Sequence, residues 1–155
     1  MAPEFVPALE LNAGFYRDAV EPLVRAWPHS AALLGSGSEL LGFDTERSTD
    51  HGWGPRLQLF VAPDDVITVR AAVDSGLPTE YRGWPVAFGW DDVPSTHHVY
   101  VVPLAQWLRT RLGCDATKAM INAAWLTMPQ QRLLGVVRGA VYPDPTGALR
   151  AVRGR

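Results

Sequence analysis

The chain has 155 residues, 47% of them hydrophobic, with a formal net charge of −2 and a pI near 6.0. This length supports one ordinary hydrophobic core and is too short for two full domains. The bulk charge gives no reason to expect nucleic acid as a partner. The single cysteine, Cys114, excludes an intramolecular disulfide, and no apolar run approaches the roughly 20 residues that span a bilayer. We therefore expect one cytoplasmic domain with neither a membrane nor a nucleic-acid partner.

The first third of the chain alternates helical and extended patterns. Apolar residues at helical spacing predict a helix over Leu9–Trp27 that is disturbed at Pro22. The run Ser30–Gly35 is typical of a short buried strand, and Ser38–Gly42 of a brief helix. A polar loop over Phe43–Gly54 follows.

The rest of the chain interleaves short strands with helices. Alternating residues predict a strand over Arg56–Val61, and Pro63 opens a helix that runs to Asp74. The remaining predicted elements are strands over Trp84–Trp90 and His98–Val102 and helices over Pro103–Leu112 and Pro129–Ala140. This order indicates an α/β (α+β) fold.

The predicted domain covers residues 1–147, and residues 148–155 form a basic C-terminal tail. The tail contains Arg150, Arg153 and Arg155. We interpret it as a solubilising, poorly ordered terminus in preference to a phosphate-binding segment.

The apolar run that ends in Gly35-Ser36-Gly37-Ser38 is the first candidate site. Glycines let a backbone approach a ligand closely, and successive N–H groups at a turn form a cradle for phosphate oxygens. Magnesium-assisted phosphoryl transfer also needs carboxylates at positions i and i+2 of a strand. Asp50 supplies the first carboxylate, but position 52 is a glycine.

The segment Gly35–Arg56 (GSGSELLGFDTERSTDHGWGPR) resembles an uncharacterised bacterial family of the polymerase-beta-like nucleotidyltransferase superfamily. The blocks Asn122–Arg132 and Gly139–Asp144 resemble the same family, so the resemblance covers roughly residues 5 to 147. It implies a mixed sheet flanked by helices. It also implies a helical second half beyond the end of this chain.

The resemblance further implies a site built from Gly-Ser, a spacer and Asp-x-Asp. Gly37-Ser38 and Asp50 match this pattern, and Gly52 departs from it. A last carboxylate is implied on a later strand, where Tyr100 stands instead. We expect the glycine at position 52 to remove charge and to enlarge the pocket for a more apolar ligand.

These arguments give a set of candidate residues with three roles. The candidate catalytic residues are Asp50, Tyr100 and His51, and Asp50 is the candidate metal ligand. Adjacent strand residues point to opposite faces, so one histidine of the pair His97-His98 at most faces the site. The candidate ligand-binding residues are Gly35, Ser36, Gly37, Ser38, Arg56, Trp53, Trp84, Trp90 and His98.

Two functions from different classes remain open. The first is a repurposed nucleotidyltransferase fold that binds a small molecule or performs metal-independent chemistry. The second is an active transferase that uses Mg²⁺ and a nucleoside triphosphate, with Glu39, Asp44 or Glu46 replacing the lost carboxylates. The expected partners are a small molecule or nucleotide, together with a second copy of the chain or a helical protein.

Overall fold

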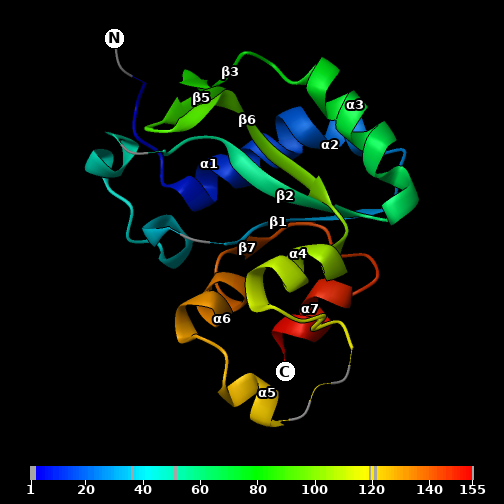
Figure 1. Cartoon of the computed structure of the whole chain (residues 1–155). Helices are drawn as coiled ribbons and strands as arrows, with labels where there is room; N and C mark the ends of the chain where they lie inside the picture. The colour runs from blue at the N-terminus through cyan, green and yellow to red at the C-terminus, as the bar shows by residue number, and fades with distance from the viewer. Residues whose placement is uncertain (1–2, 36, 51, 119, 121, 155) are drawn as a thin grey trace.

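The computed structural model describes residues 3–35, 37–50, 52–118, 120 and 122–154. A five-stranded mixed sheet lies at its centre, in the order β5-β6-β2-β1-β7 (Figure 1). The strands of this sheet are β1 (His29–Leu33), β2 (Arg56–Val61), β5 (Ala87–Trp90), β6 (Val93–Val102) and β7 (Ala140–Val141). β3 (Glu80–Tyr81) and β4 (Trp84–Pro85) form a separate two-stranded ribbon.

The strand pairing makes the sheet mixed. β1 is antiparallel to β2 and β7, β5 is antiparallel to β6, and β2 is parallel to β6. A parallel pair needs a crossover, which the 3₁₀ helix η4 (Pro63–Asp65) and α3 (Val66–Gly76) begin. The α/β (α+β) class predicted from the sequence is confirmed.

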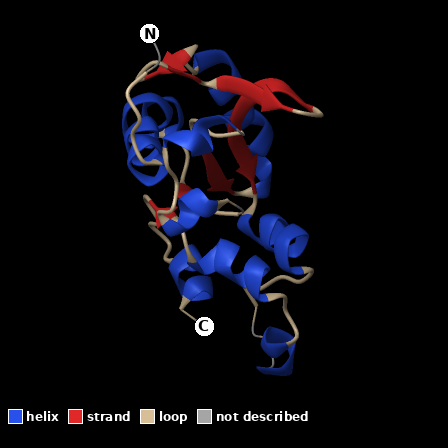
Figure 2. Cartoon of the chain, turned by 90° about the vertical axis from the view of Figure 1, so that its left-hand side faces the viewer, coloured by secondary structure: helices blue, strands red, loops and turns tan. Residues whose placement is uncertain are grey.

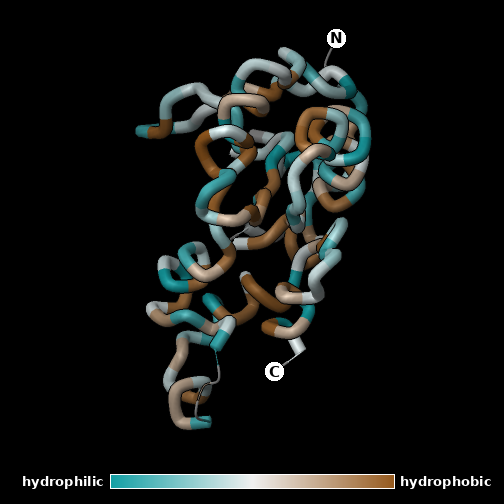
Figure 3. The backbone as a smooth tube through the Cα atoms, turned by 90° about the vertical axis from the view of Figure 1, so that its right-hand side faces the viewer, coloured by the Kyte–Doolittle hydropathy of each residue, from teal (hydrophilic) through white to brown (hydrophobic). Residues whose placement is uncertain are grey.

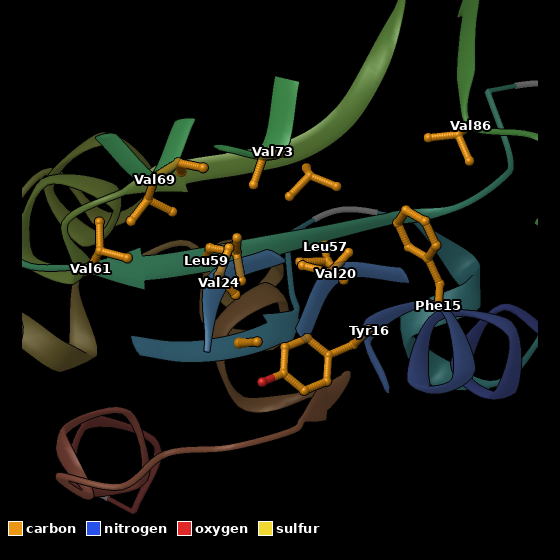
Figure 4. Close-up of a cluster of buried hydrophobic side chains, with 13 residues drawn as sticks. Phe15, Tyr16, Val20, Val24, Leu57, Leu59, Val61, Val69, Val73 and Val86 are labelled. Atoms are coloured by element: carbon orange, nitrogen blue, oxygen red, sulfur yellow. The ribbon is translucent and has the colours of Figure 1, made fainter. Parts of the chain in front are cut away.

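One face of the sheet packs against the N-terminal helices and α3. The predicted first helix is divided into α1 (Ala8–Phe15), a π-helical turn η1 (Tyr16–Val20) and α2 (Glu21–Val24). Pro22 lies at the start of α2, where a missing N–H is tolerated. Figure 4 shows side chains of these helices and of α3 gathered around Leu57 and Leu59 of β2. This cluster is the larger part of the core.

The C-terminal helices cover one end of the opposite face, beneath the strands (Figures 1 and 2). They are α4 (Leu104–Leu112), α5 (Asn122–Leu126), α6 (Gln130–Val137) and α7 (Ala148–Arg153). Phe60 and Leu34 pack there against Leu108, Val136 and Leu149. Figure 3 shows the hydrophobic stretches running through the middle of the molecule. No helix in the described ranges is long and apolar enough to cross a membrane.

Two further 3₁₀ helices lie between β1 and β2. η2 (Ser38–Leu41) follows the glycine turn as the sequence predicts, and η3 (Glu46–Asp50) lies within the predicted polar loop.

The expectation of a poorly ordered terminus is wrong for residues 148–153. These residues form α7, and its Leu149 and Val152 are buried. Their spacing of three residues places both side chains on one helical face. Such a short apolar pair is a weak signal in a segment that also contains two arginines.

A buried carboxylate anchors α7 to the sheet. Asp144 accepts hydrogen bonds from the Ser30 hydroxyl at 2.8 Å and from the backbone N–H groups of Leu149 and Arg150 at 3.4 and 3.0 Å. Burial raises the pKa of Asp144, but these hydrogen bonds together outweigh it and hold the pKa below its ordinary value. The sequence analysis did not find this anchor.

Asp144→Ala is expected to lower the free energy of unfolding by about 3 kcal/mol, because it leaves two buried donors and one partly buried donor without an acceptor. Urea unfolding followed by circular dichroism measures this. The matched control is Asp92→Ala at an exposed position, which should change stability by less than about 0.5 kcal/mol. Equal effects of the two substitutions would contradict the anchoring role.

Candidate functional site

On the sheet face that is opposite α1 and α3, the end that the C-terminal helices do not cover is polar. The parallel register pairs Arg56 with His98 and Gln58 with Tyr100, and these four residues alternate with the buried core residues of β2 and β6. We call them the polar end of the sheet. Arg56, Gln58 and Tyr100 line a hollow of about 790 Å³, which Trp90 and side chains of α4 also border. We call this the main hollow.

Gln58 fixes the chain that leaves β1. Its side-chain carbonyl accepts the Leu34 N–H at 2.8 Å, and its amide donates to the Leu34 carbonyl at 2.9 Å. Both groups are buried, so losing the pair would leave backbone polar groups unsatisfied. Sequence reasoning missed this role, although a glutamine among the apolar residues of a predicted strand is a visible signal.

The glycine turn follows directly but differs from a simple phosphate cradle. The Gly35 N–H donates to the Gly135 carbonyl at 2.9 Å and is therefore not available to a phosphate. Gly35 and Gly37 line a separate hollow of about 360 Å³ together with Leu134 and Gly135 of α6. Ser36 lies outside the described residues. Ser38 begins η2, and its side chain is not described.

Three arginines line the main hollow, Arg56 of β2, Arg70 of α3 and Arg111 of α4, and Asp74 of α3 also borders it. Arg56 forms a partly buried ion pair with Glu39, which compensates its charge. Arg111 of α4 lies over the Trp107 ring, 5.7 Å from its centroid. Its Nη2 lies 2.6 Å from the position that a Cβ at Gly35 would occupy. Among the described residues no carboxylate pairs with Arg111.

His98 and Tyr100 form a hydrogen-bonded pair with a defined direction. His98 Nε2 lies 2.8 Å from the Phe88 carbonyl, which can only accept, so Nε2 carries a proton. Burial lowers the pKa of His98, despite the opposing effect of this hydrogen bond, and favours the neutral ring. Nδ1 is then an acceptor, and the Tyr100 hydroxyl donates to it at 2.7 Å. His97 points to the other face of β6 and pairs with Asp74. His97 and Asp74 border the main hollow, whereas His98 lies behind Tyr100 and is buried. The predicted ligand-binding role of His98 therefore stays a prediction.

Trp90 occupies the space over Gly52. A Cβ at Gly52 would lie 2.8 Å from Trp90 Cδ2, and the residue has a φ of +57°. The ring also neighbours Phe88 and His98, with a centroid 5.2 Å from that of His98. The expectation that Gly52 enlarges the pocket is therefore wrong, because an aromatic ring fills the volume that a side chain would need.

The other two candidate tryptophans lie in a different cluster. Trp53 packs with Phe5 and Trp84 at ring-centroid distances of 5.7 and 4.7 Å. Its indole N–H donates to Asp44 at 3.1 Å. Asp44 also accepts the Ala8 N–H at 2.7 Å, so the cluster ties the N-terminal segment to the loop before β2.

The described residues do not fit a two-metal site. Position 52 has no room for a carboxylate, and the Tyr100 hydroxyl is directed at His98. Glu39 pairs with Arg56, and Asp44 accepts hydrogen bonds from the N-terminal cluster. Within the described part of the chain, no three His, Cys, Asp or Glu side chains gather as a metal would require.

The structure does not describe the side chains of two candidate catalytic residues, Asp50 and His51. Asp50 ends η3, and its side chain is not described. His51 lies outside the described residues. The predicted roles of Asp50 and His51 therefore stay predictions. The structure brings together Arg56, Trp90, His98 and Tyr100, and it adds Gln58 and Arg111, which the sequence analysis did not select.

Gly52→Ala is expected to lower the free energy of unfolding more than Gly42→Ala does. Both glycines have positive φ, +57° and +74°, and a left-handed residue costs alanine about 1–2 kcal/mol at either position. Only the Gly52 substitution meets a neighbour, Trp90, whereas nothing lies within 4 Å of a Cβ at Gly42. Urea unfolding measures both, and the excess should vanish in a Trp90→Ala background. A persistent excess would show that Trp90 does not fill this space.

His98 is expected to titrate below the ordinary histidine pKa of about 6.5. Its lowered pKa means that the unfolded chain takes up the proton first as the pH falls. The contribution to stability is therefore complete above about pH 6.5 and decreases as the pH falls toward the folded pKa. An NMR titration of the imidazole resonances tests this, and a midpoint at or above 6.5 would contradict the buried neutral ring.

No family model, curated protein or solved structure matches the chain in comparisons with known proteins.

Proposed function

We propose that the chain is a nucleotidyltransferase-like domain that binds an anionic small molecule in the main hollow, without a pair of metal ions. Three features support the nucleotidyltransferase-like assignment. These are the mixed sheet, the glycine turn after β1 and the family-like segment before β2. The metal-independent part rests on the poor fit of the site residues to metal coordination.

The observation that carries the proposal is Arg111 at the edge of the main hollow. An arginine that has no carboxylate partner among the described residues and lies over an aromatic ring is suited to bind carboxylate or phosphate with its planar fork of N–H groups. Arg56 adds positive charge on the same hollow, although Glu39 offsets it. The expected ligand therefore carries a negative group that meets Arg111.

The other side of the hollow favours a flat or apolar group. Trp90 is 38% exposed, and its ring borders the same hollow as Arg111. Aromatic walls of this kind stack planar ligands. The Tyr100 hydroxyl directs its proton toward His98, so its oxygen can accept a hydrogen bond from the ligand. A nucleotide and an aromatic carboxylate both have this combination of groups.

Tyr100, which borders the hollow, and His98 behind it are one candidate acid–base pair, and His97 with Asp74 at the same hollow is another. In a metal-independent reaction, Tyr100 would accept a proton from the ligand as its own proton passes to His98 Nδ1. Asp50 and His51 remain further candidates for acid–base chemistry from the sequence.

Calorimetric titration tests the binding with AMP, ATP and inorganic pyrophosphate as probes, each in excess EDTA. At least one probe should bind, and Arg111→Gln should weaken it by roughly tenfold or more, because a charge-assisted hydrogen bond is lost. The matched control is Arg109→Gln, which removes the same charge from α4 at a residue paired with Asp115. Failure of all three probes to bind, or equal losses in both variants, would contradict the proposal.

The active-transferase alternative has its own measurement. The protein is incubated with Mg²⁺ or Mn²⁺ and labelled nucleoside triphosphates, and pyrophosphate release is followed. The proposal predicts no metal-dependent release. Release that Asp50→Asn abolishes would replace the proposal with the magnesium-dependent transferase.

A further inference from the structure

The charges of the chain are distributed unevenly between its two parts. Residues 104–155 contain eight Arg or Lys and two Asp, a formal charge of +6. Residues 1–103 contain six Arg and fourteen Asp or Glu, a formal charge of −8. The net charge of −2 hides this difference. The basic part forms the layer of helices α4 to α7 beneath the sheet (Figure 1).

The two acidic residues of the basic part pair with Arg109, Lys118 and Arg150 and so offset only part of its charge. The side chains of Asp115 and Asp144 are only 12% and 1% exposed. Asp144 anchors α7, and Asp115 holds Thr117 and lies near Arg109 and Lys118. An anion that approaches these helices therefore meets few exposed carboxylates.

Three arginines lie where α6 ends against α7. Arg153 Nη2 donates to the Val137 carbonyl at 2.7 Å, which brings Arg153 beside Arg138, the next residue. Arg150 lies one turn earlier on α7, and its side chain is 75% exposed. Its Nε is 3.7 Å from Asp144.

Arg153 itself shows an uncompensated charge. Its Nε is buried and has no hydrogen-bond partner in the described part of the chain. Burial lowers the pKa of Arg153, as expected for a cation that no carboxylate stabilises. Among the described residues neither Arg138 nor Arg153 has a carboxylate partner.

A hollow with an aromatic wall continues this surface toward β1. It has a volume of about 430 Å³, and Trp27, His29, Pro143 and Arg150 are among its lining residues. Arg25 and Glu21 also border it and pair with each other, and Asp144 borders it beside Arg150, so the positive charge of the surface comes from Arg138 and Arg153 next to the hollow. The loop Tyr142–Pro143 hydrogen-bonds to Ala31, so this hollow lies next to α7 in space. We call Arg138, Arg150, Arg153 and this hollow the basic face.

We propose that the basic face binds single-stranded nucleic acid, with Arg138, Arg150 and Arg153 contacting phosphates and Trp27 stacking on a base. Positive grooves that contain aromatic side chains bind single strands in this way, largely without sequence preference. Arginine is the residue best suited to contact phosphate with two parallel hydrogen bonds. The proposal is independent of the small-molecule site, because it concerns a different surface.

Fluorescence anisotropy tests the proposal with labelled oligo(U) and oligo(dT) of about 20 nucleotides. We expect binding that weakens steeply between about 50 and 200 mM salt, since each phosphate contact releases a counterion. The double variant Arg138→Gln/Arg150→Gln should weaken binding by roughly tenfold and make the slope of log K against log salt shallower by about 1.4.

The matched control is Arg17→Gln/Arg82→Gln. It removes two exposed arginines from the acidic part, each near a carboxylate partner as Arg150 is. The control should change affinity by less than about twofold. Equal weakening by both double variants, or no binding at the lowest salt concentration, would overturn the proposal.

Trp27→Phe tests the stacking contact with a side chain that keeps most of the packing, and circular dichroism verifies the fold. We expect roughly threefold weaker binding of oligo(dT), and no change with Trp125→Phe on α5. The competing occupant of the basic face is a second copy of the chain. Light scattering without oligonucleotide measures whether the protein self-associates. Salt-sensitive self-association that the oligonucleotide does not displace would assign the basic face to the acidic part of a second copy and overturn the proposal.

Discussion

The parallel register between β2 and β6 is the constraint on which the rest of the site depends. It places Arg56 beside His98 and Gln58 beside Tyr100 on the same face of the sheet. A shift of one residue would exchange these polar side chains with the buried Leu57 and Val99. The apolar face under α1 and α3 therefore fixes the position of the polar groups, because moving Gln58 and His98 into the apolar cluster would remove the hydrogen bonds that satisfy them on this face.

The side chains at the polar end of the sheet are either neutral or paired with another group. Arg56 is compensated by Glu39, Gln58 satisfies the backbone of Leu34, and Tyr100 donates to a neutral His98. Arg111 keeps a charge without a carboxylate partner in the described residues. Among the described residues, Asp74 is the only carboxylate that borders the main hollow, and Mg²⁺ needs several oxygen ligands, so the arrangement is better suited to an anion.

Trp90 explains why position 52 is a glycine. A glycine at position 52 suggests an empty volume beside the backbone, but the indole ring of Trp90 occupies that volume. The same ring borders the main hollow and neighbours His98. Gly52 is therefore part of an aromatic wall, and the positive φ and the close ring together oppose any larger residue there.

The sequence predicted the elements that have strong periodicity or clear boundaries. β2 was placed at its observed bounds, because alternating residues between Pro55 and Pro63 leave little freedom. The two-residue β7 and the short α7 were missed, because their formation depends on partners distant in the sequence: Ala32 and Leu33 for β7 and Asp144 for α7. Local patterns do not contain this information.

The candidate site was predictable only where residue chemistry and strand alternation agreed. His98 and Arg56 were selected in this way and Tyr100 from the family resemblance, and the structure places the three near one another. Trp53 and Trp84 were grouped with the site by their position in the sequence, and the fold moves them into the N-terminal cluster. Gln58 contacts Leu34, and Arg111 contacts Trp107. The sequence next to Gln58 and Arg111 does not predict these contacts.

The central claim is that an anion binds beside Arg111 and Trp90 without metal. The most direct measurement follows the six tryptophan indole N–H resonances by NMR while AMP is added in EDTA, with assignments from single Trp→Phe variants. The account predicts shifts of Trp90 and Trp107, while Trp53 and Trp84 stay unchanged. Shifts that require Mg²⁺, or that involve Trp53 and Trp84 alone, would contradict it.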